Sequence, residues 1–118
     1  LEIQRRLAKK DSFYLSYVAD ICNNLAVLLK DTNRMEEAEA CFREAMESYR
    51  RLADTNPTAF EPNLAAIFYN LGSFAYKRGN QDDSKLYLKE ALSLFEKFPH
   101  LAEYAQDCRD RLAELQDA

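Results

Sequence analysis

The sequence is poor in the two residues that interrupt helices, with two glycines and three prolines among 118 residues. They stand between segments whose apolar residues recur every three or four positions, and no stretch alternates apolar and polar residues as a strand does. The sequence therefore predicts an all-α chain. Helix ends are expected at Asp31-Thr32-Asn33, where Asn33 is predicted to cap the next helix with Glu36 completing a capping box, and at Gly79-Asn80 and Pro99. The third helix is expected to start at Asn56-Pro57 or, alternatively, at Glu61-Pro62.

Other absences exclude whole classes of protein. No uninterrupted apolar run approaches the roughly 18–20 residues of a membrane-spanning helix, and the first residues show no signal peptide. A net charge of −4 and a pI of about 5.0 argue against a general nucleic-acid binder, which needs a basic face. No phosphate loop, nucleophile elbow or zinc spacing is present. We therefore expect no enzyme, no catalytic residue, no metal and no cofactor.

The three cysteines lie on apolar helical stripes and lack metal-type spacing. This pattern is typical of small buried thiols in a reducing compartment. The sequence therefore predicts a cytoplasmic protein.

What the chain does contain is a repeat at an offset of 46 residues, the difference between positions 70 and 24. Asn24-Leu25-Ala26 returns as Asn70-Leu71-Gly72. The same offset pairs Ile21 with Ile67, Cys22 with Phe68, Phe42 with Leu88, Ala45 with Ala91 and Tyr49 with Phe95. Self-similarity at one offset predicts a stack of like units, and such stacks usually bind and seldom catalyse.

The repeat divides one domain into four parts, residues 1–10, 11–54, 56–98 and 99–118. Each middle part is a helical hairpin, and the first helix is expected to start near Asp11 or Ser12. Its predicted apolar face carries Val18, Ile21, Cys22, Leu25, Leu28 and Leu29. The last part is interpreted as a capping helix, with the first helix of a third unit as the alternative.

The first ten residues match the end of a later helix, because Arg5-Arg6-Leu7-Ala8 repeats as Arg50-Arg51-Leu52-Ala53. We interpret them as the end of a preceding repeat. The chain is then expected to be a fragment of a longer protein.

Both hairpins resemble the tetratricopeptide repeat, whose first helix reads large apolar, Leu, small, aromatic and whose second reads small, aromatic, small. The first unit has Cys22, Leu25, Ala26 and Leu29, then Ala38, Phe42 and Ala45. The second has Phe68, Leu71, Gly72 and Ala75, then Ser84, Leu88 and Ala91. The spacing is similar to the longer repeats of the kinesin light chain class and of bacterial signalling arrays. The resemblance implies a right-handed α-α superhelix of antiparallel hairpins.

The resemblance also implies a concave groove lined by the first helix of each unit. Register places nine candidate partner-binding residues there: Asn23, Asn24, Val27, Lys30, Tyr69, Asn70, Ser73, Tyr76 and Lys77. The two repeated asparagines suit the backbone of an extended peptide, and the tyrosines offer apolar area with a polar tip. Lys77 and Arg78 are expected to attract an acidic peptide or a C-terminal carboxylate.

The sequence thus predicts a non-enzymatic module that binds a peptide or a partner helix, with neither nucleic acid nor membrane as partner. The alternative is a structural, self-association or spacer region of a larger signalling protein. A homodimer through exposed terminal helices, such as the segment Leu1-Ile3-Leu7, belongs to that alternative.

Overall fold

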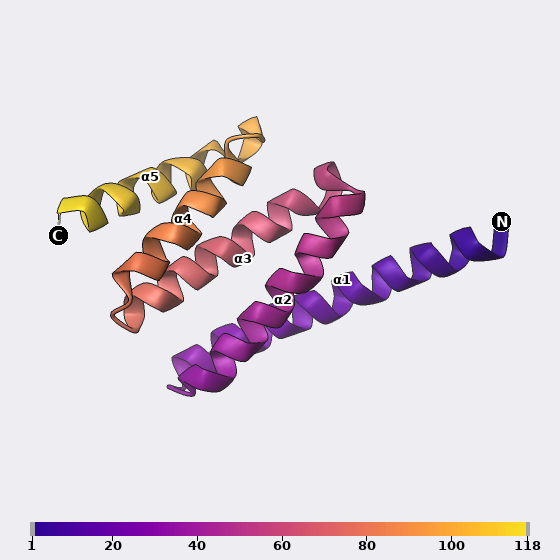
Figure 1. The fold of residues 1–118 in the computed structure, drawn as a ribbon, viewed down its shortest axis with the longest axis horizontal. Helices are drawn as coiled ribbons and strands as arrows, with labels where there is room; N and C mark the ends of the chain where they lie inside the picture. The colour runs from indigo at the N-terminus through magenta and orange to yellow at the C-terminus, as the bar shows by residue number, and fades with distance from the viewer. Residues whose placement is uncertain (1, 118) are drawn as a thin grey trace.

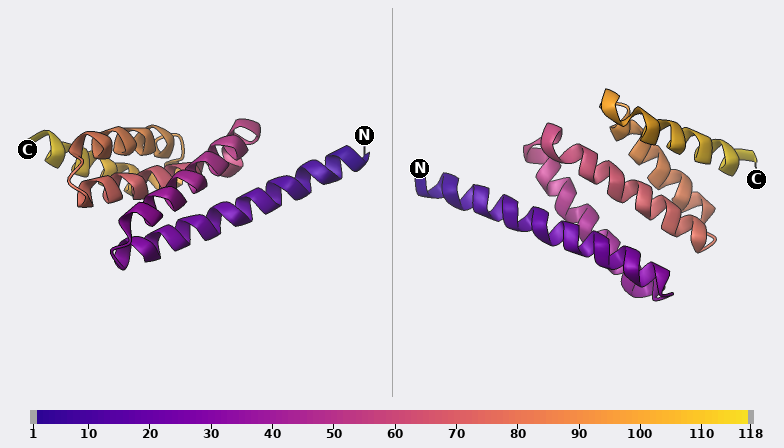
Figure 2. Two further views of the ribbon diagram at one scale, coloured as in Figure 1. Left: turned by 60° about the horizontal axis from the view of Figure 1, so that its bottom comes forward. Right: turned by 180° about the vertical axis from the view of Figure 1, so that it is seen from behind.

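The computed structural model describes residues 2–117, and side-chain environments are described for residues 11–116. The helices are α1 (Glu2–Asp31), α2 (Met35–Thr55), α3 (Pro57–Lys77), α4 (Gln81–Phe95) and α5 (Ala102–Asp117), and a 3₁₀ turn, η1 (Pro99–Leu101), precedes α5. Helices α1, α3 and α5 form one layer and α2 and α4 the other (Figures 1 and 2). The predicted all-α solenoid of antiparallel hairpins is confirmed.

Packing runs mainly between helices that are neighbours in sequence, from α1 with α2 to α4 with α5. The molecule is therefore elongated, with extents of 55 × 34 × 19 Å and a radius of gyration of 15.3 Å. A compact domain of 100 residues has a radius of gyration of about 13 Å. The segment Leu1-Ile3-Leu7, expected to promote dimers, lies outside the residues whose side chains are described.

The predicted ends around α3 are confirmed. The Asn56 side chain accepts a hydrogen bond from the Ala59 amide (3.3 Å), and Pro57 is the first helical residue. Gly79 adopts φ = 82°, the left-handed conformation expected after a helix. The Asn80 side chain then accepts from the Asp83 amide (3.1 Å) and starts α4.

The predicted cap at Asn33 is wrong. Asn33 itself takes a left-handed turn conformation (φ = 64°), so its side chain cannot cap α2. Arg34 occupies the cap position without a side-chain cap bond, and its guanidinium pairs with Glu37 at 2.6 Å. The Thr32 hydroxyl instead closes α1 by donating to the Leu28 carbonyl oxygen (3.0 Å).

The predicted start of the first helix is also wrong, because α1 runs without a break from Glu2 to Asp31. Asp11 and Ser12 favour helix starts, but no glycine or proline precedes Pro57 to stop a helix. A cap residue inside a helical segment does not by itself end it, since its preference is worth only about 1 kcal/mol. The interpretation of residues 1–10 as the end of a preceding repeat stays a prediction.

The second hairpin closes tightly at Gly72. A Cβ atom there would lie 2.9 Å from Cγ of Leu88, so only glycine permits the observed approach of α3 and α4. The Ser84 hydroxyl donates to the Gly72 carbonyl oxygen (2.8 Å) in the same contact. The small residues predicted at the crossings, Ala26, Ala38, Ala45, Gly72, Ser84 and Ala91, are all buried.

The predicted apolar face of α1 is wrong in part. Helix α2 covers the side with Ala19, Ala26 and Leu29, while Ile21, Leu25 and Leu28 remain 48%, 43% and 60% exposed. Their equivalents in α3, between α2 and α4, are Ile67, Leu71 and Phe74, which are only 1%, 2% and 3% exposed. The apolar pattern marks positions that are buried in the second unit. In the described structure, no helix covers the equivalent positions of the first unit.

Segment Asp11–Asp31 of the same helix meets the length and composition criteria of a membrane-spanning helix. By length and composition alone it is long and apolar enough to cross a membrane, and most of its residues are not buried in the structure. The sequence contains no long uninterrupted apolar run. The average hydropathy of this segment is nevertheless high, because apolar residues lie on two sides of the helix. A single helix of this kind is weak evidence.

Candidate protein-binding furrow

Helices α3 and α5 lie side by side in the layer of odd-numbered helices, and four of their side chains join them. The Tyr69 hydroxyl donates to the Asp107 carboxylate. The Arg111 guanidinium lies 4.9 Å from the centre of the Tyr69 ring, pairs with Asp107 at 3.2 Å and donates to the Ser73 hydroxyl at 3.1 Å. We call the surface around this cluster, between α3 and α5, the furrow.

The surroundings of Tyr69 in the furrow keep its hydroxyl protonated, so that it donates a hydrogen bond. Burial and, to a smaller extent, the hydrogen bond to Asp107 together raise the pKa of Tyr69 to about 12, against an opposing effect of the Arg111 charge. The phenol is therefore protonated at neutral pH and donates to a carboxylate, an arrangement stronger than a bond between neutral groups.

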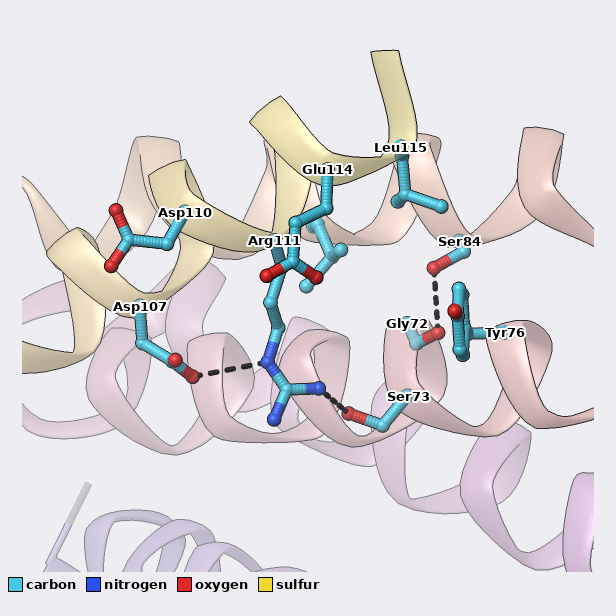
Figure 3. A pocket seen from close by; sticks show the side chains of 10 residues that line it. Gly72, Ser73, Tyr76, Ser84, Asp107, Asp110, Arg111, Glu114 and Leu115 are labelled. Atoms are coloured by element: carbon cyan, nitrogen blue, oxygen red, sulfur yellow. Dashed lines mark hydrogen bonds and ion pairs between the residues drawn. The ribbon is translucent and has the colours of Figure 1, made fainter. Parts of the chain in front are cut away.

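A polar hollow of about 380 Å³ lies on one side of this cluster (Figure 3). Its floor includes the α4 residues Ser84 and Leu88. Its walls are Gly72, Ser73 and Tyr76 of α3 and Asp107, Asp110, Arg111, Glu114 and Leu115 of α5. Three carboxylates and one guanidinium give the walls a net negative charge.

An apolar hollow of about 350 Å³ lies on the other side of the cluster, toward the N-terminal ends of α3 and α5. Pro62, Ala66, Tyr69 and Asn70 of α3 line it, together with Phe95, Leu101 and Tyr104. The Tyr104 ring stacks on Phe95 with centroids 5.4 Å apart and is 56% exposed. An exposed aromatic ring over a buried one is a common feature of protein-binding surfaces.

The structure brings together some of the nine predicted residues and leaves others apart. The Asn70 amide donates to the Asn23 side-chain oxygen at 3.0 Å and so links α1 with α3. Tyr69 and Asn70 line the apolar hollow, and Ser73 and Tyr76 line the polar hollow. The remaining candidates line neither hollow: Asn24 and Lys77 are exposed, and Val27 and Lys30 are half-buried.

The expected role of Arg78 in attracting an acidic peptide is not supported. Its guanidinium lies over the Phe74 ring at 5.8 Å and approaches the Glu39 carboxylate of α2 at 3.5 Å. Arg78 therefore lines a different hollow, between α2 and α4, and not the furrow.

The α5 side of the furrow was not predicted, because residues 99–118 were interpreted as a capping helix. Asp107 and Arg111 are four residues apart and so share one face of a helix. The 46-residue register does not locate Asp107, which follows Tyr69 by 38 residues. Within the part of the chain with described side chains, no group of three or more His, Cys, Asp or Glu residues could hold a metal ion.

Comparison with known protein families identifies the same repeat that the sequence pattern resembles. A family model described as tetratricopeptide repeat matches residues 18–57 and 64–97. The chain therefore belongs to the tetratricopeptide repeat family, whose members generally mediate protein–protein interactions and are generally not enzymes.

A solved structure agrees with the fold. The crystal structure of BtubC (BKLC) from P. vanneervenii matches with a TM-score of 0.60 at 22% sequence identity, covering 98% of this chain and 54% of that one. This chain thus spans about half the length of BtubC. No curated protein matches the sequence.

Proposed function

We propose that this chain is a non-enzymatic interaction module that binds a peptide or partner helix in the furrow between α3 and α5. This proposal rests on the two hollows, of about 350 and 380 Å³, that flank the cluster of Tyr69, Asp107 and Arg111. Preformed concave sites of this size are typical of ligand binding. Because the cluster satisfies its own polar groups, a partner adds contacts in the hollows and does not have to break the α3–α5 joint.

The test is a selection of binders from a random pentadecapeptide library on the immobilised chain. Selected peptides are then measured on the Tyr69→Ala/Arg111→Ala variant and on a control, Leu86→Ala, which changes an exposed side chain of α4. We expect binding to fall at least about tenfold on the first variant and to be unchanged on the control. Circular dichroism must show both variants folded. Peptides that bind all three proteins equally would refute the furrow as the site.

A second candidate function, self-association, is favoured by the uncovered face of α1. Its exposed apolar side chains are Phe13, Tyr14, Tyr17, Ile21, Leu25 and Leu28. Together they offer on the order of 700 Å², judged from the usual areas of such side chains. Pairing two such faces would bury about 1,400 Å², within the range of stable interfaces.

Sedimentation equilibrium over a concentration series tests this candidate. We expect a monomer–dimer equilibrium in the wild type and a monomer in Ile21→Glu/Leu25→Glu. Leu86→Glu is the matched control, because Leu86 is an exposed leucine on α4. A wild type that stays monomeric at every concentration would exclude dimerisation through this face.

The proposed partner is a protein, not a membrane or a nucleic acid. Asp20, Asn23 and Asn24 lie in the middle of the apolar segment of α1, where a charged group is costly in a bilayer. The net charge of −4 opposes phosphate binding. Free thiols at Cys22, Cys41 and Cys108 support placement in a reducing compartment such as the cytoplasm.

A further inference from the structure

We infer that the partner segment carries one apolar and one basic side chain about 10 Å apart, the apolar one for the apolar hollow and the basic one for the polar hollow. This inference rests on the proposed function, since it names the chemistry of the partner that the furrow takes. It reverses the expectation, based on Lys77 and Arg78, of an acidic peptide.

The apolar hollow has the character of an anchor site. Carbon atoms make up most of its lining, supplied by Pro62, Ala66, Phe95, Leu101 and Tyr104, and Asn70 adds an amide at its edge. Burying one large apolar side chain there is worth about 1.5–3 kcal/mol. An amide at the rim can bond the backbone of the incoming segment.

Charge complementarity determines what the polar hollow accepts. Arg111 is its only cation, and that guanidinium is already engaged by Asp107 and Ser73. Asp110 accepts a bond from Gln106 (2.9 Å), and no ion pair among the described residues involves Asp110 or Glu114. Two carboxylates therefore remain for a guest, and a lysine or arginine side chain complements them.

The helices fix the separation of the two guest side chains. Ala66 and Tyr104 line the apolar hollow, and Ser73 and Arg111 line the polar one, seven residues further along α3 and α5 respectively. Seven residues of helix span about 10 Å. In an extended peptide of the polyproline II form, with three residues per turn, the two guest residues are then about three positions apart on one face. In a helical partner they are about seven apart, also on one face.

The experiment reads which residues the library selection enriches. We expect peptides selected on the wild type to combine an apolar residue with lysine or arginine three or seven positions away. On Asp110→Asn/Glu114→Gln, the chosen peptides should bind about tenfold more weakly while their apolar preference persists. On Tyr104→Ser the apolar preference should be lost. Asp54→Asn/Glu90→Gln removes the same charge from exposed positions outside both hollows and should change neither preference.

The outcomes separate the inference from the function on which it rests. Peptides that depend on Tyr69 and Arg111 but carry acidic residues, or no preferred charge, would overturn the inference and leave the furrow as a binding site. Equal weakening by the Asp54/Glu90 control would also overturn it, since the effect would then be one of net charge. A selection that returns no furrow-dependent peptide would refute the proposed function as well.

Discussion

Tyr69 holds in the second repeat the position that Asn23 holds in the first, 46 residues earlier, and each bonds to the next odd-numbered helix. Asn23 accepts from Asn70 of α3 at 3.0 Å, and Tyr69 donates to Asp107 of α5. A polar pair therefore joins each odd-numbered helix to the next one. Two amides join α1 to α3, and a phenol and a carboxylate join α3 to α5. The second pair holds the two sides of the furrow together.

The bond between Tyr69 and Asp107 should stabilise the C-terminal end of the molecule. We predict that Tyr69→Phe lowers the free energy of unfolding by about 1 kcal/mol. A buried hydrogen bond to a charged acceptor contributes more than this, but the bond between Tyr69 and Asp107 is partly exposed to solvent. Urea unfolding followed by circular dichroism measures the change. Tyr104→Phe is the control, because no side-chain bond of its hydroxyl is present among the described residues, and a loss as large there would contradict the assignment.

The same tyrosine predicts a dependence on alkaline pH. Its folded-state pKa, raised to about 12, lies above the ordinary value of 10, so the folded state favours the protonated phenol. The stabilising contribution is therefore complete below pH 10 and is lost as the pH rises from 10 toward 12. Thermal unfolding of wild type and Tyr69→Phe should give midpoints that converge over this window. Midpoints that stay equally far apart at every pH would contradict the linkage.

The contact of Gly72 with Leu88 predicts that the two glycines respond differently to one substitution. Gly72→Asn should destabilise the chain by about 1–3 kcal/mol, because its Cβ would press on Leu88 at a close helix crossing. Gly79→Asn should cost less than about 1 kcal/mol, since asparagine tolerates a left-handed conformation and no atom lies within 4 Å. Chemical denaturation compares the two, and equal costs would be inconsistent with the crossing as the cause.

The repeat offers a matched pair of leucines in opposite environments. Leu71→Lys should destabilise the fold by more than about 4 kcal/mol, because it places an unpaired charge between α2 and α3. Leu25→Lys, at the equivalent position of α1, should stay within about 0.5 kcal/mol of the wild type, since that side chain is exposed. A severe loss for Leu25→Lys in the monomeric range would mean that α1 is covered in solution.

Burial also predicts a ranking of thiol reactivity. Cys108 is buried, and desolvation, with a smaller effect of Asp107, raises the pKa of its thiol to about 11. Cys22 and Cys41 are half-buried, and burial raises their pKa values as well. Labelling with a disulfide reagent at neutral pH should modify Cys108 last, and only at the rate of local opening. Mass spectrometry of the labelled peptides identifies the order.

The fold could be predicted largely because helix boundaries depend on local residues. Asn56-Pro57 and Gly79-Asn80 act through their own backbone preferences, and each appears in the structure as expected. The boundary at Asn33 was misread because asparagine suits both a cap and a left-handed turn, and sequence alone does not separate the two. The exposure of Leu25 depends on a neighbouring helix, which no local pattern reveals.

The repeat register selects residues on the α3 side of the furrow and none on its α5 side, and their role in binding stays a prediction. The repeat register selected Tyr69, Asn70, Ser73 and Tyr76, which line the hollows of the furrow. Their partners on α5 were missed, since the distance from α3 to α5 differs from the 46-residue period and charged residues on a last helix suggest solvent. Lys77 was selected by the same register but lines neither hollow, because it stands about 100° around the helix from Tyr76, which lines the polar one.

The order of packing, in which each helix lies mainly against the helices before and after it, makes the molecule mechanically compliant along its length. Bending between the two hairpins strains the contact of α2 with α3 and the Asn23–Asn70 bond between α1 and α3. The width of the furrow depends instead on α4, which lies beneath both of its walls. The spacing of the furrow walls on α3 and α5 is therefore expected to be insensitive to bending at the α2–α3 contact.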